Sequence, residues 1–285
     1  MSVTSLGRPL LWALGAYALV CLLVFLAQRA LMYFPERFGE AEAQRRATFL
    51  GLRAWRDPAG RLLGWRPLRS AARTRVLAFH GNAGSALDRV YYLEAVGGPE
   101  REVVLFEYPG YGARPGHPSQ RTLVEAAVAA FTQLRAERPG PVWLLGESLG
   151  SGVAAQIVAR DPRAPAGLIL VTPIARMADV AAWHYPYLPV RALLRDRWDS
   201  LAALRAFRGP AAILVAGRDE VVGAEQGRQL ARGLPTPPRL WEQPDAGHNS
   251  VDVLPGALPW PEIRALVDAS AQNDTGGQGR SPLAR

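Results

Sequence analysis

The chain has 285 residues, enough for one large domain or two small ones. Hydrophobic residues make up 49% and charged residues 20%, which is typical of a packed domain and excludes a chain that is disordered throughout. The net charge of +8 rests on arginine alone, and the arginines are scattered rather than gathered in a basic run, so we expect no nucleic-acid partner. The single cysteine, Cys21, excludes an intrachain disulfide and a multi-cysteine zinc site.

The chain opens with an apolar segment. Residues 9–28 carry no formal charge and lie between Arg8 and Arg29. A helix of about 20 residues spans the ~30 Å hydrocarbon core of a bilayer. Trp12 and Tyr33 lie near the two ends, as interfacial aromatic residues often do. A cleaved secretory signal is the alternative, but the apolar run is long and no clean small-residue cleavage site follows it. The sequence therefore predicts a single-pass membrane anchor over residues 9–28.

Arginines flank this anchor unevenly. Its amino-terminal side carries Arg8 and the α-amino group. Residues 29–46, which we interpret as a juxtamembrane linker, carry Arg29, Arg37, Arg45 and Arg46. The positive-inside rule then favours a domain on the cytoplasmic side of the membrane.

Residues 47–270 are predicted to form one α/β domain. A hairpin comes first, with strands at 48–55 and 61–67 around the turn D-P-A-G at 57–60. Short apolar runs then alternate with helical stretches, which predicts a mostly parallel sheet covered by helices on both faces. The predicted strands are 76–79, 103–106, 142–145, 168–171, 212–215 and 240–241, and the clearest helices are 123–134, 152–160 and 224–234.

Two segments depart from this alternation. Residues 178–210 hold several aromatic residues among prolines and arginines. They form either a small cap that offers apolar contacts to a substrate, or an excursion whose aromatic residues complete the core. Residues 271–285 are polar and rich in glycine, which predicts a disordered tail.

The sharpest motif is G-E-S-L-G at residues 146–150, between a predicted strand and a predicted helix. This is the context of a nucleophile elbow, in which a serine in a strained turn projects from the sheet edge beside a helix amino terminus. Ser148 is therefore the candidate nucleophile. A serine hydroxyl is weak by itself and needs a base and a group that orients the base.

Four histidines could supply the base: His80, His117, His184 and His248. His248, in the loop after the last predicted strand, is preferred because it follows the serine and has an acid upstream of it at a strand end.

Asp219 is that acid, since it comes directly after the strand at 212–215. Asp179 is the second choice, and Asp245 is too close to the histidine in sequence. Glu220 is expected to cap a helix or to face solvent.

The oxyanion of the tetrahedral intermediate needs two N–H donors. The backbone of Leu149 is one, because it follows the nucleophile directly. The loop H-G-N-A-G at 80–84 should supply the other, with Asn82 preferred and Ala83 next. The motif Y-P-G-Y-G at 108–112 predicts only a rigid turn, whose aromatic rings line a pocket or pack in the core.

Together these motifs resemble the α/β-hydrolase superfamily, and more narrowly its single-span, membrane-anchored members. The resemblance rests on H-G-N-A, Y-P-G-Y-G, G-x-S-x-G, D-x-V-V at 219–222 and G-H at 247–248, and covers about residues 10–270. One departure is Gly223, where the group usually has proline, which is expected to soften the turn without touching the chemistry.

The resemblance implies a serine hydrolase that cleaves esters or thioesters of lipids or acylated molecules, with no metal or organic cofactor. A serine peptidase of aminopeptidase type on the same fold is the alternative, because a fold does not fix its substrate. A membrane-bound binding protein without activity is the other alternative, but it would not need the serine, the histidine and the acid together.

Overall fold

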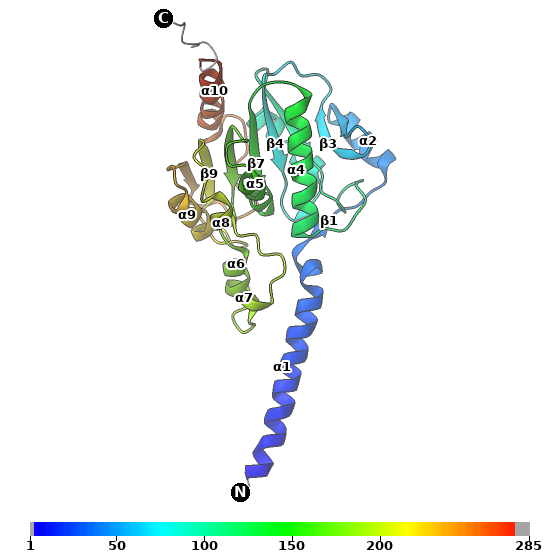
Figure 1. Cartoon of the computed structure of the whole chain (residues 1–285), viewed down its shortest axis with the longest axis vertical. Helices are drawn as coiled ribbons and strands as arrows, with labels where there is room; N and C mark the ends of the chain where they lie inside the picture. The colour runs from blue at the N-terminus through cyan, green and yellow to red at the C-terminus, as the bar shows by residue number, and fades with distance from the viewer. Residues whose placement is uncertain (1–2, 277–285) are drawn as a thin grey trace, which may run out of the picture.

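A computed structural model describes residues 3–276, with side chains described for residues 8–270. Within this part of the chain an eight-stranded sheet forms the centre of the molecule (Figure 1). In spatial order its strands are β10 (Arg239–Gln243), β9 (Ala211–Ala216), β8 (Gly167–Val171), β7 (Val142–Glu147), β4 (Thr74–Phe79), β6 (Arg101–Phe106), β3 (Leu62–Pro67) and β2 (Leu52–Arg56).

The strands from β10 to β6 are parallel, and β3 and β2 add an antiparallel hairpin at one edge. The prediction of a mostly parallel sheet is therefore confirmed. Successive side chains of a strand point to opposite faces. In β4, Leu77 packs into one core and Val76 into the other, so each strand has to be apolar on both sides.

Helices cover both faces of the sheet, as predicted. One core lies under α4 (Gln120–Glu137), α5 (Leu149–Arg160), α8 (Ser200–Leu204) and α9 (Ala224–Gly233). The other lies under α2 (Glu40–Phe49), the 3₁₀ helix η1 (Ala86–Arg89), α3 (Tyr92–Ala95) and α10 (Trp260–Gly276). Residues 271–276, predicted to be disordered, continue α10, and residues 277–285 of the predicted tail lie outside the described residues.

The amino-terminal helix α1 (Val3–Met32) extends away from the domain (Figure 1). Its residues Arg8–Met32 are long and apolar enough to cross a membrane, by length and composition. Strand β1 (Phe34–Pro35) follows at once and pairs in parallel with β5 (Ala83–Gly84). The predicted linker at 29–46 thus contains β1 and most of α2, which are packed on the domain.

The first strand of the hairpin is shorter than predicted, because α2 occupies its expected beginning. Residues 48 and 49 belong to the helix, and β2 begins only at Leu52. The helix ends where Gly51 takes a φ of 70°, a left-handed conformation that glycine adopts at helix ends without steric cost.

The aromatic segment at 178–210 has two parts with different surroundings. Its first part forms α6 (Met177–His184) and α7 (Val190–Leu193), which project from the domain beside α1 (Figure 1). Trp183, Tyr185 and Tyr187 are exposed on this part. Its second part returns to the core, where Trp198 and Phe207 are buried. We call residues 177–194 the cap.

Candidate active site

Ser148 lies at the sharp turn between β7 and α5. Its φ of 51° is unusual for a residue with a side chain, and its N–H donates to the Val171 carbonyl at 2.9 Å. Glycines on both sides permit this turn. A Cβ atom at Gly150 would overlap the Phe79 carbonyl oxygen, and one at Gly146 would collide with the backbone of the first turn of α5. The G-x-S-x-G spacing therefore lets the helix begin directly against the sheet.

His248 reaches this serine from the loop after β10. Its Nε2 lies 2.9 Å from the Ser148 hydroxyl oxygen, and both side chains are largely buried. The backbone N–H of His248 donates to a carboxylate oxygen of Glu220 at 3.2 Å. Glu220 is exposed, as predicted, but it also holds the histidine loop, a contact that the sequence did not reveal.

Asp219 completes the line of side chains from the end of β9. Its Oδ2 lies 2.8 Å from Nδ1 of His248. Its other oxygen accepts backbone N–H groups of Val221 at 3.0 Å, Val222 at 2.8 Å and Gly223 at 3.2 Å. Burial would raise the pKa of Asp219, but the hydrogen bonds from His248 and the backbone outweigh it and hold the pKa below its usual value.

Gly223 therefore contributes more to the site than the sequence indicated. Its φ of 85° is unavailable to proline, and its N–H is one of the donors to Asp219. The glycine that stands in place of the usual proline is thus adapted to this conformation of the acid turn.

The other acid candidates lie in unrelated ion pairs. Asp179 pairs with Arg191 in the cap. Asp245 pairs with Arg218 at 2.6 Å on the surface. Neither carboxylate faces His248.

The other histidines have different surroundings. His117 is exposed. His80 is buried, with Nε2 3.4 Å from a carboxylate oxygen of Glu107. His184 lies in the cap, and its Nε2 is 2.7 Å from the carbonyl oxygen of Val221 in the turn that follows Asp219.

The loop proposed for the oxyanion site lies against the nucleophile. A Cβ atom at Gly81 would be 3.7 Å from Cβ of Ser148, and Asn82 and Leu149 line the same cavity as Ser148. Leu149 is the first residue of α5, where backbone N–H groups have no acceptor within the helix. The two predicted donors therefore border one space next to the serine.

The Y-P-G-Y-G motif holds this loop in place. The Tyr108 hydroxyl donates to the His80 carbonyl at 2.8 Å, and the Tyr111 hydroxyl donates to the Asn82 carbonyl at 2.8 Å. Phe34 N–H of β1 donates to the same Asn82 carbonyl at 2.9 Å. Both tyrosines are buried, so the rings pack in the core while their hydroxyls position the loop.

Glu147, the residue before the serine, is also held by hydrogen bonds. The Glu147 carboxylate accepts hydrogen bonds from Tyr91 at 2.6 Å and Tyr92 at 2.9 Å, and from Arg89 Nε at 2.9 Å. No motif or periodicity predicts these contacts, because the three donors come from a distant segment.

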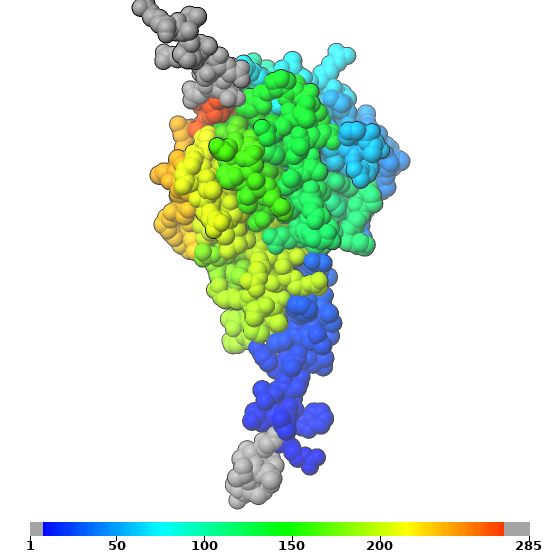
Figure 2. All heavy atoms as spheres, in the orientation of Figure 1, coloured from blue at the N-terminus to red at the C-terminus, as the bar shows by residue number. Residues whose placement is uncertain are grey.

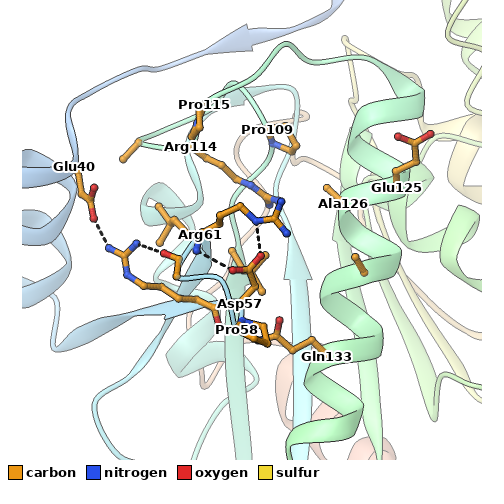
Figure 3. A pocket seen from close by; sticks show the side chains of 16 residues that line it. Glu40, Asp57, Pro58, Arg61, Pro109, Arg114, Pro115, Glu125, Ala126 and Gln133 are labelled. Carbon is orange, nitrogen blue, oxygen red and sulfur yellow. Dashed lines mark hydrogen bonds and ion pairs between the residues drawn. The ribbon is translucent and has the colours of Figure 1, made fainter.

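A cavity of about 310 Å³ opens beside Ser148. Its lining is mostly apolar and comes from α1, the cap and the loops that carry the site residues. A larger cavity of about 690 Å³ lies at the turn between β2 and β3, next to α4 (Figure 3). There Arg61 pairs with Asp57 at 2.6 Å, and neither Ser148, His248 nor Asp219 lines it. The cavity beside Ser148 is therefore the candidate active site.

Metal ligation has no candidate in the part of the chain that the structure describes, where no group of three or more His, Cys, Asp or Glu side chains could hold an ion.

Comparisons with known proteins place the sequence among related chains. Residues 70–203 match the family described as serine aminopeptidase, S33. An uncharacterized protein of Mycobacterium tuberculosis is 32% identical over 263 residues, which cover 88% of this chain and 91% of that protein. Lysophosphatidylserine lipase ABHD12 of Xenopus tropicalis is 31% identical over 147 residues, which cover 47% of this chain and 38% of that lipase.

Solved structures share the fold. The α/β hydrolase GrgF of a Penicillium species superposes with a TM-score of 0.59 at 15% identity, covering 78% of this chain and 98% of GrgF. The monoacylglycerol lipase of Paleococcus ferrophilus superposes with a TM-score of 0.53 at 20% identity, covering 71% of this chain and 96% of the lipase.

Proposed function

We propose that this chain, which has the α/β-hydrolase fold and belongs to the same family as the Mycobacterium tuberculosis protein, is a membrane-anchored serine hydrolase that cleaves carboxylic ester or thioester bonds of lipids or acylated molecules. One observation carries the proposal. The hydroxyl of Ser148, the imidazole of His248 and the carboxylate of Asp219 are joined by contacts of 2.9 and 2.8 Å. This arrangement can turn a serine hydroxyl into a nucleophile.

The proposed reaction has two halves. The Ser148 oxygen attacks the carbonyl carbon of the substrate while His248 Nε2 takes the hydroxyl proton. The N–H groups of Leu149 and Asn82 stabilise the oxyanion. The tetrahedral intermediate then releases the alcohol or thiol, which receives the proton from His248, and the acyl group stays on Ser148. Water repeats the sequence, releases the carboxylic acid and restores the serine. Asp219 stabilises the imidazolium in both halves.

The apolar lining of the cavity supports an acyl chain as the bound group, and the lysophosphatidylserine lipase relatives support a lipid ester. The apolar helix α1 supports a single-pass anchor, which would keep the site close to lipid. The arginines that follow α1 continue to favour a catalytic domain on the cytoplasmic side.

The matching family description makes a serine aminopeptidase the second candidate. A site that removes amino-terminal residues has to bind a free α-amino group, for which a carboxylate is the usual partner. Among the described residues that line the cavity beside Ser148 there is no aspartate or glutamate. This lining favours an ester over a peptide substrate.

A fluorophosphonate probe tests the nucleophile. The detergent-solubilised protein should be labelled and should hydrolyse p-nitrophenyl esters, and Ser148→Ala should lose the labelling and about 10⁶-fold in kcat. Labelling that survives Ser148→Ala would refute the assignment. A parallel series of thioesters and aminoacyl anilides separates the substrate classes, and a preference for anilides would favour the peptidase.

A further inference from the structure

We propose that α1 is one wall of the acyl-chain site and the cap is the other, so that a lipid chain enters between them from the bilayer, and that Val24 and Leu31 of α1 limit the chain length accepted. This inference rests on the proposed hydrolase function and adds to it. It gives the helix a part in substrate selection besides anchoring.

The first support is the lining of the cavity beside Ser148. From α1 it includes Val24, Gln28, Leu31 and Met32, and from the cap it includes Met177, Val180, Ala181, Val190 and Leu194. Ser148 and Leu149 line the same cavity. The space of about 310 Å³ is at the lower end of the size range for small-ligand sites, so one large side chain would fill a substantial part of it.

The second support is that α1 is bonded to the end of the cap and to the two residues that follow it. The side chain of Gln28 donates to the Leu193 carbonyl at 3.3 Å and accepts from Arg195 N–H at 2.7 Å. Arg29 pairs with Asp196 at 3.1 Å. These contacts hold the α1 wall at a set distance from the opposite wall.

A third support is the depth that the cap reaches along α1. The Tyr17 hydroxyl donates to the Tyr187 carbonyl at 2.9 Å, whereas Tyr33 beyond the end of the helix bonds to Asp196. At 1.5 Å per residue the two points are about 24 Å apart along the chain. Figure 2 shows the yellow-green cap packed along the blue helix below the domain.

Because Val24 belongs to the helix segment that is suited to cross a bilayer, the part of the cap beside it would enter the leaflet on the side of the domain, and the cap tip at Tyr187 would reach about the middle of the span. Its exposed Trp183 and Tyr185 have the amphipathic rings typical of the membrane interface. The cavity would then open toward lipid, and an acyl chain would reach Ser148 without crossing water.

The test compares two tryptophan substitutions on α1. Val24→Trp places a large side chain in the cavity, and Leu26→Trp is the matched control, since Leu26 is 63% exposed and does not line the cavity. We measure kcat/KM for p-nitrophenyl esters from acetyl to hexadecanoyl in one detergent. In Val24→Trp the ratio of hexadecanoyl to acetyl activity should fall about tenfold or more. In Leu26→Trp the ratio should stay as in the wild type. Leu31→Trp should act like Val24→Trp.

The same ratio in Val24→Trp, Leu31→Trp and Leu26→Trp would overturn the inference while leaving the hydrolase function intact. A second readout does not depend on catalysis. A fatty acid with a terminal diazirine, added to Ser148→Ala protein in phosphatidylcholine vesicles, should label peptides of both α1 and the cap. Adding Val24→Trp should remove the part of that labelling that excess unlabelled fatty acid competes away, and adding Leu26→Trp should not. If the wild type cleaves no ester, the proposed function fails, and the labelling still decides where an acyl chain binds.

Discussion

Asp219 has two tasks at the residue scale, and each carboxylate oxygen performs one of them. Oδ2 contacts His248, and Oδ1 accepts N–H groups of the following turn. The turn fixes the carboxylate, and the carboxylate fixes the imidazole. The stability of the acid loop and the orientation of the base are therefore linked through one side chain.

Asp219→Asn should lower kcat about 10⁴-fold, because an amide neither selects the required imidazole tautomer nor stabilises its cation. Ester hydrolysis by the purified variant measures the effect. Asp245→Asn is the control, since its side chain is 84% exposed and pairs with Arg218 on the surface, and it should retain its turnover. Near-normal turnover in Asp219→Asn would assign the acid to another residue.

Asp219 should also make stability depend on pH. Its pKa is lower in the folded chain than the usual value of about 3.9, so its contribution is complete above that value and is lost as the pH falls through the folded pKa. The Tm of the wild type should exceed that of Asp219→Asn at about pH 7, and the difference should shrink toward about pH 3. A difference that does not change with pH would contradict this account.

At the scale of elements, the loop at 80–84, which we propose for the oxyanion site, is held by three separate segments. Tyr108 and Tyr111 bond to its carbonyl groups from the turn after β6, and β1 pairs with it through β5. The Asn82 side chain in turn donates to the Met32 carbonyl at the end of α1 at 3.0 Å. This loop, which borders the cavity beside Ser148, is therefore joined to the end of the apolar helix.

Tyr111→Phe tests this support. The substitution removes the hydroxyl donor to the Asn82 carbonyl but keeps the ring, and a net hydrogen bond of about 1 kcal/mol corresponds to a fall in kcat of about fivefold. KM should change little, because the oxyanion forms only after binding. Tyr187→Phe, on an exposed cap residue, is the control. An unchanged kcat in Tyr111→Phe would assign Tyr111 to packing alone.

The regular part of this architecture could be predicted because its signal is local. β4, β7 and β9 are short runs that are apolar on both faces, and the glycines around Ser148 mark a turn that few other residues allow. Ser148, His248 and Asp219 were identified by motif and chain order, and the structure brings them into contact.

The remaining features depend on distant contacts. β1 has only two residues, and it is a strand because β5 lies beside it. The hydroxyl of Tyr111 donates a hydrogen bond to a carbonyl that lies 29 positions earlier, and no sequence periodicity predicts this pair. The contact of Glu220 with the His248 N–H could not be predicted from the sequence, because it depends on how two loops pack against each other.

At the scale of the whole molecule, hydrogen bonds and an ion pair attach the end of α1 to the domain. The carboxylate of Asp196 is 4% exposed and accepts hydrogen bonds from Arg29 and from the Tyr33 hydroxyl at 2.9 Å. Burying a carboxylate without a cation costs stability, so this contact ties the helix to the segment that leads from the cap to the core.

Arg29→Met should therefore lower the free energy of unfolding by about 1–3 kcal/mol, because it removes the cation from a buried carboxylate. Thermal unfolding in detergent measures the change. Arg45→Met is the control, since the Arg45 side chain is 70% exposed and its carboxylate partner lies on the same helix. Equal Tm values for the two variants would show that the Arg29 contact contributes no more than a surface pair.

The contacts that join the end of α1 and strand β1 to the loop at 80–84 have a kinetic consequence. If α1 anchors the chain in a bilayer, as we propose, these contacts would hold the Ser148 hydroxyl at one height relative to the lipid headgroups. Encounters would then take place by lateral diffusion in two dimensions. Turnover in mixed micelles or vesicles would follow the mole fraction of substrate in the surface, and diluting the suspension with buffer at constant surface composition would leave the rate per enzyme unchanged.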